Sequence, residues 1–355
     1  MKYHSRLRIA LLFGGRGAEH EVSLRSAASV ARALVDASDL IFVGITKTGA
    51  IYLYTGSPQS IEDGKWESES TRLYPTSFVR LGEKRGLLLG GTVVPVDVVL
   101  PILHGDFGED GKIQGWLEAV GLPYVGASPL AGSICQDKAV TKILAEHLSL
   151  PTVPWCTIRA GTSFAEAKLQ IRATMPTHEF PLILKPTALG SSIGVFTATD
   201  DLSLREALKM SEPYGEMLIE QYLVGAREVE VCYLRAPEEH FFIGEVNLPD
   251  SNTPYTYDKK YNTSLSPLCE GKLPEEIEST LYRYCRALVG LLEMRELCRI
   301  DFLLDRSGKL YFNEINTLPG FSEHSFYPKV CKQNGWDYKP LLLSLCEAAY
   351  DRHLR

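Results

Sequence analysis

Two carboxylates and an amide lie close together near residue 300, in a segment typical of a β-hairpin. Two apolar runs flank a turn at 307–308, which predicts two antiparallel strands. Pairing across that turn places Asp301 opposite Glu314, and Asn316 shares the face of Glu314 because alternate side chains of a strand point the same way. Carboxylates this close repel unless a cation joins them, and three oxygen ligands with room for phosphate oxygens suit Mg²⁺. The alternative is an exposed hairpin face with scattered polar side chains.

A lysine at the end of an apolar strand, followed by small residues, favours a phosphate-binding site. Lys185 ends the run 181–185, and the following loop contains Gly190, Ser191 and Ser192. Backbone N–H groups in such a loop can meet an anion. The segment lacks the Gly-Lys-Ser/Thr pattern of the P-loop. An ordinary Gly/Ser loop between strands is the alternative.

Two further segments could complete a nucleotide site. The strand 217–222 runs into a short connector before Glu228, so its backbone could meet a purine and Glu228 a ribose. Charged strand ends on a normal surface explain the same residues. The stretch 248–273 has little regular pattern but contains tyrosines and paired lysines, which suggests a lid that closes on anionic groups. Its alternative is a flexible surface loop.

The first third of the chain offers two candidates, each after a buried strand. Glu21 follows the glycine-rich turn 14–17 at the start of a predicted helix, where it could bind a substrate ammonium. A helix-start acid favoured by the helix dipole is the alternative. His104 follows the apolar strand 96–103 within a glycine-rich loop. A single histidine is more often structural than catalytic, although the surrounding glycines favour a role in a site.

The elements that must position these residues alternate between strand and helix in the first third. Largely apolar strands separated by helices indicate a parallel sheet covered on both faces, with 50–92 as an elaboration. The last part of the chain favours helices on an antiparallel sheet. We therefore predict an α/β protein that is α+β in its C-terminal part. Its predicted domains are an N-terminal substrate-binding domain (1–136), a central subdomain (137–223) and a C-terminal catalytic subdomain (224–355).

Composition excludes several classes of protein. The 355-residue chain has a net charge of −7 and no basic block, so we expect no nucleic-acid partner. Its eight cysteines form no Cys-x-x-Cys, which favours reduced, buried thiols. The first apolar run is only five residues long and no later run approaches a membrane span. We expect a soluble, cytoplasmic protein that does not enter a membrane.

Taken together, the motifs resemble those of the D-alanine–D-alanine ligase family, a branch of the ATP-grasp enzymes. The resemblance runs from about residue 7 to 350. The motifs that carry it are Glu-His-Glu-Val-Ser (19–23), His-Gly-Asp-Phe-Gly-Glu-Asp-Gly-Lys-Ile-Gln-Gly (104–115), Asp-Lys (137–138), Lys-Pro with Leu-Gly-Ser-Ser-Ile-Gly (185–194), Arg-Ile-Asp (299–301), and Asn-Glu-Ile-Asn-Thr-Leu-Pro-Gly-Phe (313–321) with His-Ser (324–325). The resemblance implies an ATP-grasp fold preceded by a parallel-sheet domain. It also implies a homodimer.

The resemblance also implies a role for each candidate residue. ATP would be bound by Lys138, Lys185, Ser192, Glu220, Gln221, Leu223, Glu228 and Lys260, and Asp301, Glu314 and Asn316 would hold two Mg²⁺ (or Mn²⁺) ions. Glu21 would bind the ammonium of the first D-alanine in a network with Ser191 and Tyr261. Arg299 and the Gly320 N–H would form an oxyanion hole, while His104 and Ser325 would contact substrate. ATP would convert the first carboxylate to an acyl phosphate, which the second D-alanine attacks to form the dipeptide for peptidoglycan precursors.

The chain departs from the family pattern in the connector before Glu228, which is one residue longer than usual. Glu230 is therefore the alternative ribose ligand. The 50–92 segment resembles long-form ligases, some of which make D-alanyl-D-lactate or D-alanyl-D-serine, whereas Tyr261 favours D-alanine as second substrate. A non-catalytic nucleotide-binding protein would lack the metal ligands. A dinucleotide-dependent oxidoreductase would need Gly-x-Gly-x-x-Gly after the first strand, which this chain lacks.

Overall fold

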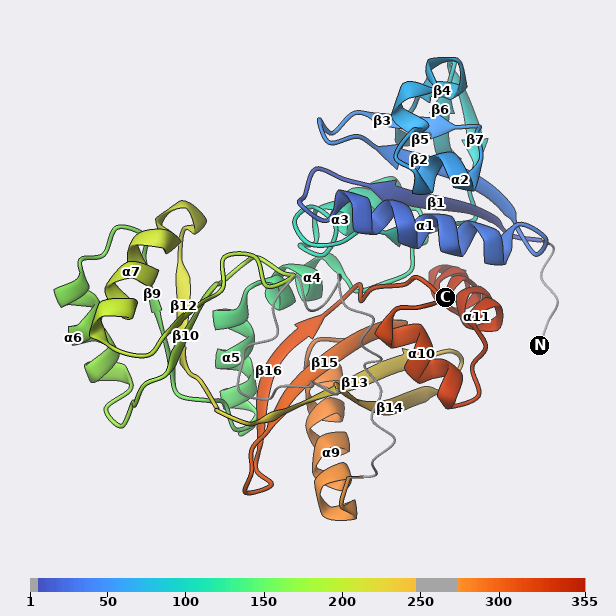
Figure 1. Cartoon of the computed structure of the whole chain (residues 1–355). Coiled ribbons are helices and arrows are strands. Elements are labelled where there is room, and N and C mark those ends of the chain that lie inside the picture. The colour runs from blue at the N-terminus through green and yellow to red at the C-terminus, as the bar shows by residue number, and fades with distance from the viewer. Residues whose placement is uncertain (1–5, 247–272, 355) are drawn as a thin grey trace.

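The N-terminal part of the computed structural model, which describes residues 6–246 and 273–354, is built on a five-stranded sheet (Figure 1). The sheet has the order β4-β3-β2-β1-β8, and β1 pairs in parallel with both of its neighbours. The predicted parallel sheet is confirmed, but its β3–β4 edge is antiparallel. Its strands are β1 (Arg8–Gly14), β2 (Asp39–Ile45), β3 (Ile51–Tyr54), β4 (Leu73–Pro75) and β8 (Val98–Ile102).

Helices cover both faces of this sheet because alternate side chains of β1 point to opposite sides. Leu11 and its alternate neighbours pack toward α1 (His20–Leu34), while Leu12 packs toward α3 (Lys112–Val120). The 50–92 elaboration adds a small antiparallel sheet beside α3. It consists of β5 (Phe78–Leu81), β6 (Lys84–Leu89) and β7 (Thr92–Pro95), with α2 (Pro58–Glu62) and the short 3-10 turns Trp66–Ser68 and Ser70–Arg72 before it.

The central unit is a four-stranded antiparallel sheet in the order β11-β10-β12-β9, with α6 and α7 packed on one face (Figure 1). Leu184 and Ile219 face those helices, so their neighbours Lys185 and Glu220 face the other way. The elements are β9 (Trp155–Ile158), α6 (Phe164–Thr174), β10 (Leu182–Pro186), β11 (Phe196–Ala198), α7 (Asp201–Ser211), the 3-10 turn Glu212–Tyr214 and β12 (Met217–Gln221).

The C-terminal unit is a second antiparallel sheet, in the order β14-β13-β15-β16, which confirms the predicted arrangement. One face packs on α9 and on the helices that precede the central unit. The elements are α4 (Pro129–Gln136), α5 (Lys138–His147), β13 (Arg227–Arg235), β14 (Glu239–Val246), α9 (Glu275–Leu291), β15 (Leu297–Leu304) and β16 (Leu310–Asn316). Helices α4 and α10 (Phe326–Gln333) were not predicted.

The two last helices connect the C-terminal unit to the N-terminal sheet. In Figure 1, α11 (Tyr338–Leu354) lies directly beneath α1, and α10 (Phe326–Gln333) lies beside the C-terminal sheet. Arg352 of α11 pairs with the buried Glu296, and both also bind the backbone around Tyr124. Each sheet lies within one of the three predicted domains, whose boundaries stay a prediction.

Two expectations from composition concern the described residues. No helix within 6–246 or 273–354 is long and apolar enough to cross a membrane. The cysteines described in these ranges are free and buried, as predicted. Burial raises the pKa of thiols such as Cys232 and Cys298, so these thiols stay protonated and behave as small core residues.

Candidate active site

A row of three acidic residues crosses the C-terminal sheet. Glu230 of β13 lies opposite Asp301 of β15, which lies opposite Glu314 of β16. Because the alternate residues of β13 and β15 pack on α9, this row faces the other side of the sheet. The predicted opposition of Asp301 and Glu314 is confirmed. Three carboxylates in line concentrate negative charge on one face, which requires cations nearby.

One such cation is the buried guanidinium of Arg299, which stands in the next row of the sheet. It donates to both oxygens of Asp301, at 2.7 Å each, and its Nε lies 2.9 Å from Glu230. Burial opposes the charge of Arg299, but the two carboxylates outweigh it and keep its pKa above the usual value. The resemblance places Arg299 in an oxyanion hole, and the structure shows its charged group held by two carboxylates of the acidic row.

The hairpin also presents the predicted metal ligands together. Asn316 donates through Nδ2 to Asp301 at 3.0 Å, so its amide group lies beside that carboxylate. Two carboxylates and an amide oxygen fit a hard divalent cation such as Mg²⁺, which commonly takes few protein ligands and completes its shell with phosphate and water. Within residues 6–246 and 273–354, no three His, Cys, Asp or Glu side chains gather as a metal site. Asp301, Glu314 and Asn316 stay the predicted ligands of such a cation.

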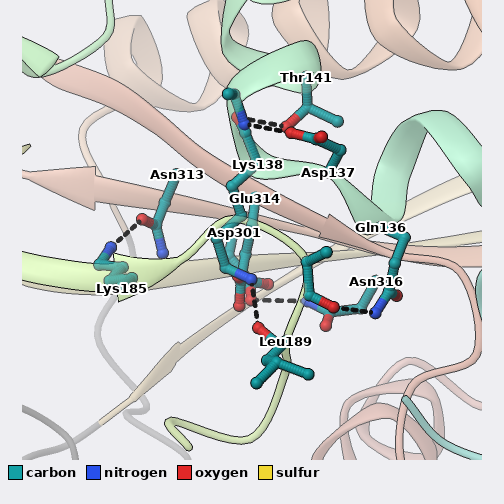
Figure 2. A network of polar contacts seen from close by, with 12 residues as sticks. Gln136, Asp137, Lys138, Thr141, Lys185, Leu189, Asp301, Asn313, Glu314 and Asn316 are labelled. Atoms are coloured by element: carbon teal, nitrogen blue, oxygen red, sulfur yellow. Dashed lines mark hydrogen bonds and ion pairs between the residues drawn. The ribbon is translucent and has the colours of Figure 1, made fainter. Parts of the chain in front are cut away.

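Lys138 reaches the same face from the start of α5. Asp137 caps the helix by accepting from two backbone N–H groups, which fixes Lys138 at the first helical position. The Lys138 ammonium donates to the Leu189 carbonyl at 2.7 Å and lies 3.5 Å from Glu314 (Figure 2). Gln136 holds the neighbouring carbonyl of Ala188, also at 2.7 Å. The predicted phosphate lysine and the small-residue loop thus lie beside the acidic row.

Lys185 belongs to a buried chain of charges that joins the two antiparallel sheets. Its ammonium lies 2.6 Å from Glu220 and donates to Asn313 at 3.2 Å (Figure 2 shows this second contact). The other oxygen of Glu220 lies 2.5 Å from Lys142. Burial opposes the charge of Glu220, but the two lysines lower its pKa to about 2. Lys142 was not predicted; its place four residues after Lys138 puts both on one helix face.

The structure corrects the prediction for Glu21. Its side chain is exposed and pairs with Lys47, whereas the hydroxyl of Ser191 donates to Glu19. Helix α1 begins at His20, so Glu19 lies in the turn before the helix and Glu21 lies within it. Two residues apart at a helix start, the two acids point to different sides. The acid that joins Ser191 in the expected network is therefore Glu19.

His104 lies where the N-terminal and C-terminal units meet. Its Nδ1 is 3.3 Å from the Leu318 carbonyl, and Glu109 accepts from the N–H groups of Gly105 and Leu318 at 2.8 and 3.1 Å. Burial, with the nearby charge of Glu19, raises the pKa of Glu109 to about 7. Glu109 belongs to the motif 104–115, and no role was predicted for it. It connects the loop after β8 to the loop that carries Gly320.

Gly320 and Ser325 are neighbours in that second loop. A Cβ built on Gly320 would lie 3.2 Å from the Ser325 hydroxyl. Ser325 is the N-cap residue directly before α10 and accepts from the N–H of Ser322 at 3.1 Å. The two residues predicted for the oxyanion hole and the second carboxylate thus lie side by side, following directly after the metal-ligand strand.

The predicted adenine and ribose residues lie at the connection between the two antiparallel sheets. Gln221 ends β12 and its side chain binds the Glu179 backbone, and Leu223 follows in the connector. Glu228 lies on the same strand face as Glu230 and raises the pKa of Lys185 slightly, after the larger effects of burial and Glu220. Arg299 holds Glu230 at 2.9 Å, and Glu228 and Glu230 both stay predicted alternatives for the ribose.

The loop after β10 has an uncommon backbone. Ser191 and Ser192 have φ values of 53° and 56°, in the left-handed region that non-glycine residues rarely adopt. Strained residues of this kind cluster at ligand sites. The remaining predicted residues, Lys260 and Tyr261, lie outside the described residues. So does the expected lid 248–273 that contains them, except for its last residue, Leu273.

Comparisons with known proteins identify the family of the chain. The model of the D-ala D-ala ligase N-terminus matches residues 8–127, and that of the C-terminus matches residues 144–347. The D-alanine--D-alanine ligase of Thermoanaerobacter sp. (strain X514) is 37% identical, with 98% of this chain and 97% of that protein covered.

Solved structures extend the comparison to the fold. The VanG D-Ala:D-Ser ligase from Enterococcus faecalis is 30% identical, with a TM-score of 0.85 over 97% of this chain and 100% of that one. The D-alanine-D-alanine ligase from Coxiella burnetii is 25% identical, with a TM-score of 0.84 over 99% and 96%.

The chain has a parallel-sheet domain followed by two antiparallel sheets whose lysines and carboxylates meet at one site, and this combination defines an ATP-grasp ligase. The predicted fold class is therefore confirmed. The chain belongs to the D-alanine–D-alanine ligase family.

Proposed function

We propose that the protein joins two D-alanines at the expense of ATP, and that its D-alanyl-D-alanine enters peptidoglycan precursors. The observation that carries this proposal is the acidic row 230–301–314, flanked by the ammonium groups of Lys138 and Lys185. A carboxylate is a poor electrophile, so joining it to an amine requires activation. Cations and acidic metal ligands gathered at one site suit phosphoryl transfer, in which charge stabilisation supplies most of the catalysis.

The nucleotide would lie between the two antiparallel sheets. Lys138 and Lys185 bind its phosphates together with the Ser192 loop, and the connector after Gln221 meets the adenine through its backbone. Glu228 binds the ribose. From the resemblance, Lys260 contacts the γ-phosphate and Glu220 stands beside the adenine.

The metal ligands are Asp301, Glu314 and Asn316, and the proposal assigns them two Mg²⁺ ions, with Mn²⁺ as a substitute. When bound, the ions neutralise the phosphate oxygens during transfer. The chain's own contribution is to hold the two carboxylates opposite each other on paired strands. Arg299 keeps Asp301 oriented and supplies positive charge where the tetrahedral carbonyl oxygen forms, together with the Gly320 N–H.

The substrate amino acids would lie between the N-terminal and C-terminal units. Glu19, in place of Glu21, binds the ammonium of the first D-alanine and is oriented by Ser191. His104 contacts substrate, Ser325 holds the second carboxylate, and Tyr261 completes the network as the resemblance implies. The first carboxylate attacks the γ-phosphorus and ADP leaves. The amine of the second D-alanine then attacks the acyl carbon, and phosphate leaves with the former carboxylate oxygen.

A second candidate function is ligation of D-alanine to D-serine or D-lactate. The likeness to the VanG D-Ala:D-Ser ligase favours considering D-serine, since the ATP site would be the same. Product analysis after incubation with ATP, Mg²⁺, D-alanine and an equal amount of D-serine or D-lactate distinguishes them. We expect D-alanyl-D-alanine as the main product, and a predominant mixed product would overturn the choice of second substrate.

The same proposal includes a homodimer in the cytoplasm. Both follow from the family resemblance. Light scattering coupled to size-exclusion chromatography tests the dimer: a mass near twice that of the 39.5 kDa chain is expected, and a mass equal to one chain would contradict it.

A further inference from the structure

Lys142 occupies a position where a helix normally presents an apolar side chain. It lies on the buried face of α5, with Ala139 and Ala145 on the same face, and only 1% of its surface is exposed. Burying an ammonium costs free energy that a partner must offset, and an apolar pair of similar size is often as stable. A lysine at this position is therefore poorly explained by stability alone.

The contacts of Lys142 lead toward the phosphate-binding lysine. Its ammonium lies 2.5 Å from Oε1 of Glu220, and Oε2 of Glu220 lies 2.6 Å from Lys185. Lys142 also donates to the Phe312 carbonyl at 3.5 Å, next to Asn313, which accepts from Lys185. The buried chain thus connects α5, the central sheet and the metal-ligand strand.

The two oxygens of the Glu220 carboxylate are shared between Lys142 and Lys185, and this sharing determines how Lys185 is held. An ammonium has three donors, and Glu220 and Asn313 take two of those of Lys185, which leaves one for a phosphate oxygen. As long as Lys142 holds Oε1, Glu220 offers a single oxygen to Lys185. Without Lys142, the whole carboxylate would turn to Lys185, draw its ammonium back and neutralise it.

We propose that Lys142 is a positioning residue of the nucleotide site: it never touches ATP but, through Glu220, sets the place of the Lys185 ammonium. The proposal rests on the proposed function and deepens it, because it assigns to the same site a lysine that acts on the nucleotide indirectly, through Glu220 and Lys185. It predicts that loss of Lys142 weakens nucleotide binding and leaves D-alanine binding unchanged.

The test measures binding of Mg²⁺–ADP to the full-length chain by titration calorimetry, which does not depend on turnover. We expect Lys142→Met to weaken ADP binding about tenfold, while KM for D-alanine changes less than about twofold. Lys168→Met is the matched control, because Lys168 pairs with Asp201 on the surface of the central unit. That control should bind ADP as the wild type does.

A double-mutant cycle separates positioning from a structural role. If Lys142 acts through Glu220, then Lys142→Met adds almost nothing to the ADP defect of Glu220→Gln. Additive losses, or an ADP affinity of Lys142→Met within about twofold of wild type, would overturn the proposal. Lys142→Gln, which can still donate to Glu220, replaces the methionine variant if that one does not fold; failure of both to fold would assign Lys142 to stability and also overturn it.

The outcomes also separate this inference from the proposed function. Wild-type protein that binds ADP but makes no dipeptide would contradict the ligase assignment. Wild-type protein that makes dipeptide, together with an unchanged ADP affinity of the Lys142 variant, would contradict only the role of Lys142.

Discussion

Asp301 and Glu314 lie directly opposite each other on β15 and β16, although the register of the hairpin shifts once between them and the turn. The turn is a three-residue loop that ends at Gly308, whose φ of +86° favours glycine. Compared with a two-residue turn, this loop shifts the strand pairs nearest to it by one residue. A bulge at Asn313 then restores the register. It also lets Phe312 and Ile315 both enter the core.

This relationship makes Glu314 the sharpest test of the metal assignment. Glu314→Gln keeps the size and the hydrogen-bonding ability of the side chain but removes its charge. We expect D-alanine-dependent ATP hydrolysis to fall at least about 1,000-fold, with the fold intact by circular dichroism, because metal ligands act together on the phosphates. Glu276→Gln, on the exposed start of α9, is the control and should retain full activity. Turnover of the Glu314 variant near the wild-type rate would remove the metal assignment.

The correction at the first helix predicts different outcomes for two neighbouring acids. Glu19→Gln should lower kcat/KM for D-alanine about 30–100-fold, because it removes a charged partner of the substrate ammonium. Glu21→Gln should change it less than about threefold, because an exposed pair with Lys47 contributes little. Steady-state rates at varied D-alanine concentration measure both. The reverse order of effects would restore Glu21 to the site.

The raised pKa of Glu109 predicts that the stability of the folded protein depends on pH. Burial raises its pKa from 4.5 to about 7, so the folded protein binds a proton that the unfolded chain has lost between these values. Its contribution to stability therefore falls as pH rises through that window, by about 1.4 kcal/mol per pH unit at most, and is level above it. Urea unfolding at several pH values should show this slope in the wild type and not in Glu109→Gln. Parallel curves for the two proteins would contradict the raised pKa.

The last helix predicts a stability effect far from the site. Arg352 is the charged partner of Glu296, whose carboxylate is buried and also accepts from the Gly126 N–H. Arg352→Ala should lower the free energy of unfolding by about 2 kcal/mol, because it leaves a buried carboxylate without its partner. Lys339→Ala, on an exposed position of the same helix, should cost less than about 0.5 kcal/mol. Equal midpoints of urea unfolding for the two variants would show that the pair does not stabilise the protein.

Local patterns predicted most of the elements and the pairing of Asp301 with Glu314. The predicted pairing is correct because two errors in register offset each other. The real turn is one residue longer than the predicted two-residue turn, and the extra residue at the Asn313 bulge shifts the register back by one. No local pattern shows a bulge in advance, because its extra residue is identified only by the partner strand.

Contacts between distant segments could not be predicted. Glu230 lies opposite Asp301 because β13 inserts between β14 and β15, an order that depends on the whole sheet. Lys142 lies on the buried face of an amphipathic helix, but lysine is so seldom buried that its residue type suggests the surface. The prediction that Glu21 joins Ser191 is wrong for a smaller reason, since it depends on where α1 begins.

The central claim is that the γ-phosphate of ATP is transferred to the carboxylate of the first D-alanine at the acidic row. Its most direct test uses D-alanine labelled with ¹⁸O in both carboxylate oxygens, with the released phosphate analysed by mass spectrometry. An acyl phosphate leaves one carboxylate oxygen on the phosphate, so each phosphate released during dipeptide formation should carry one ¹⁸O. Unlabelled phosphate accompanying dipeptide formation would contradict the account.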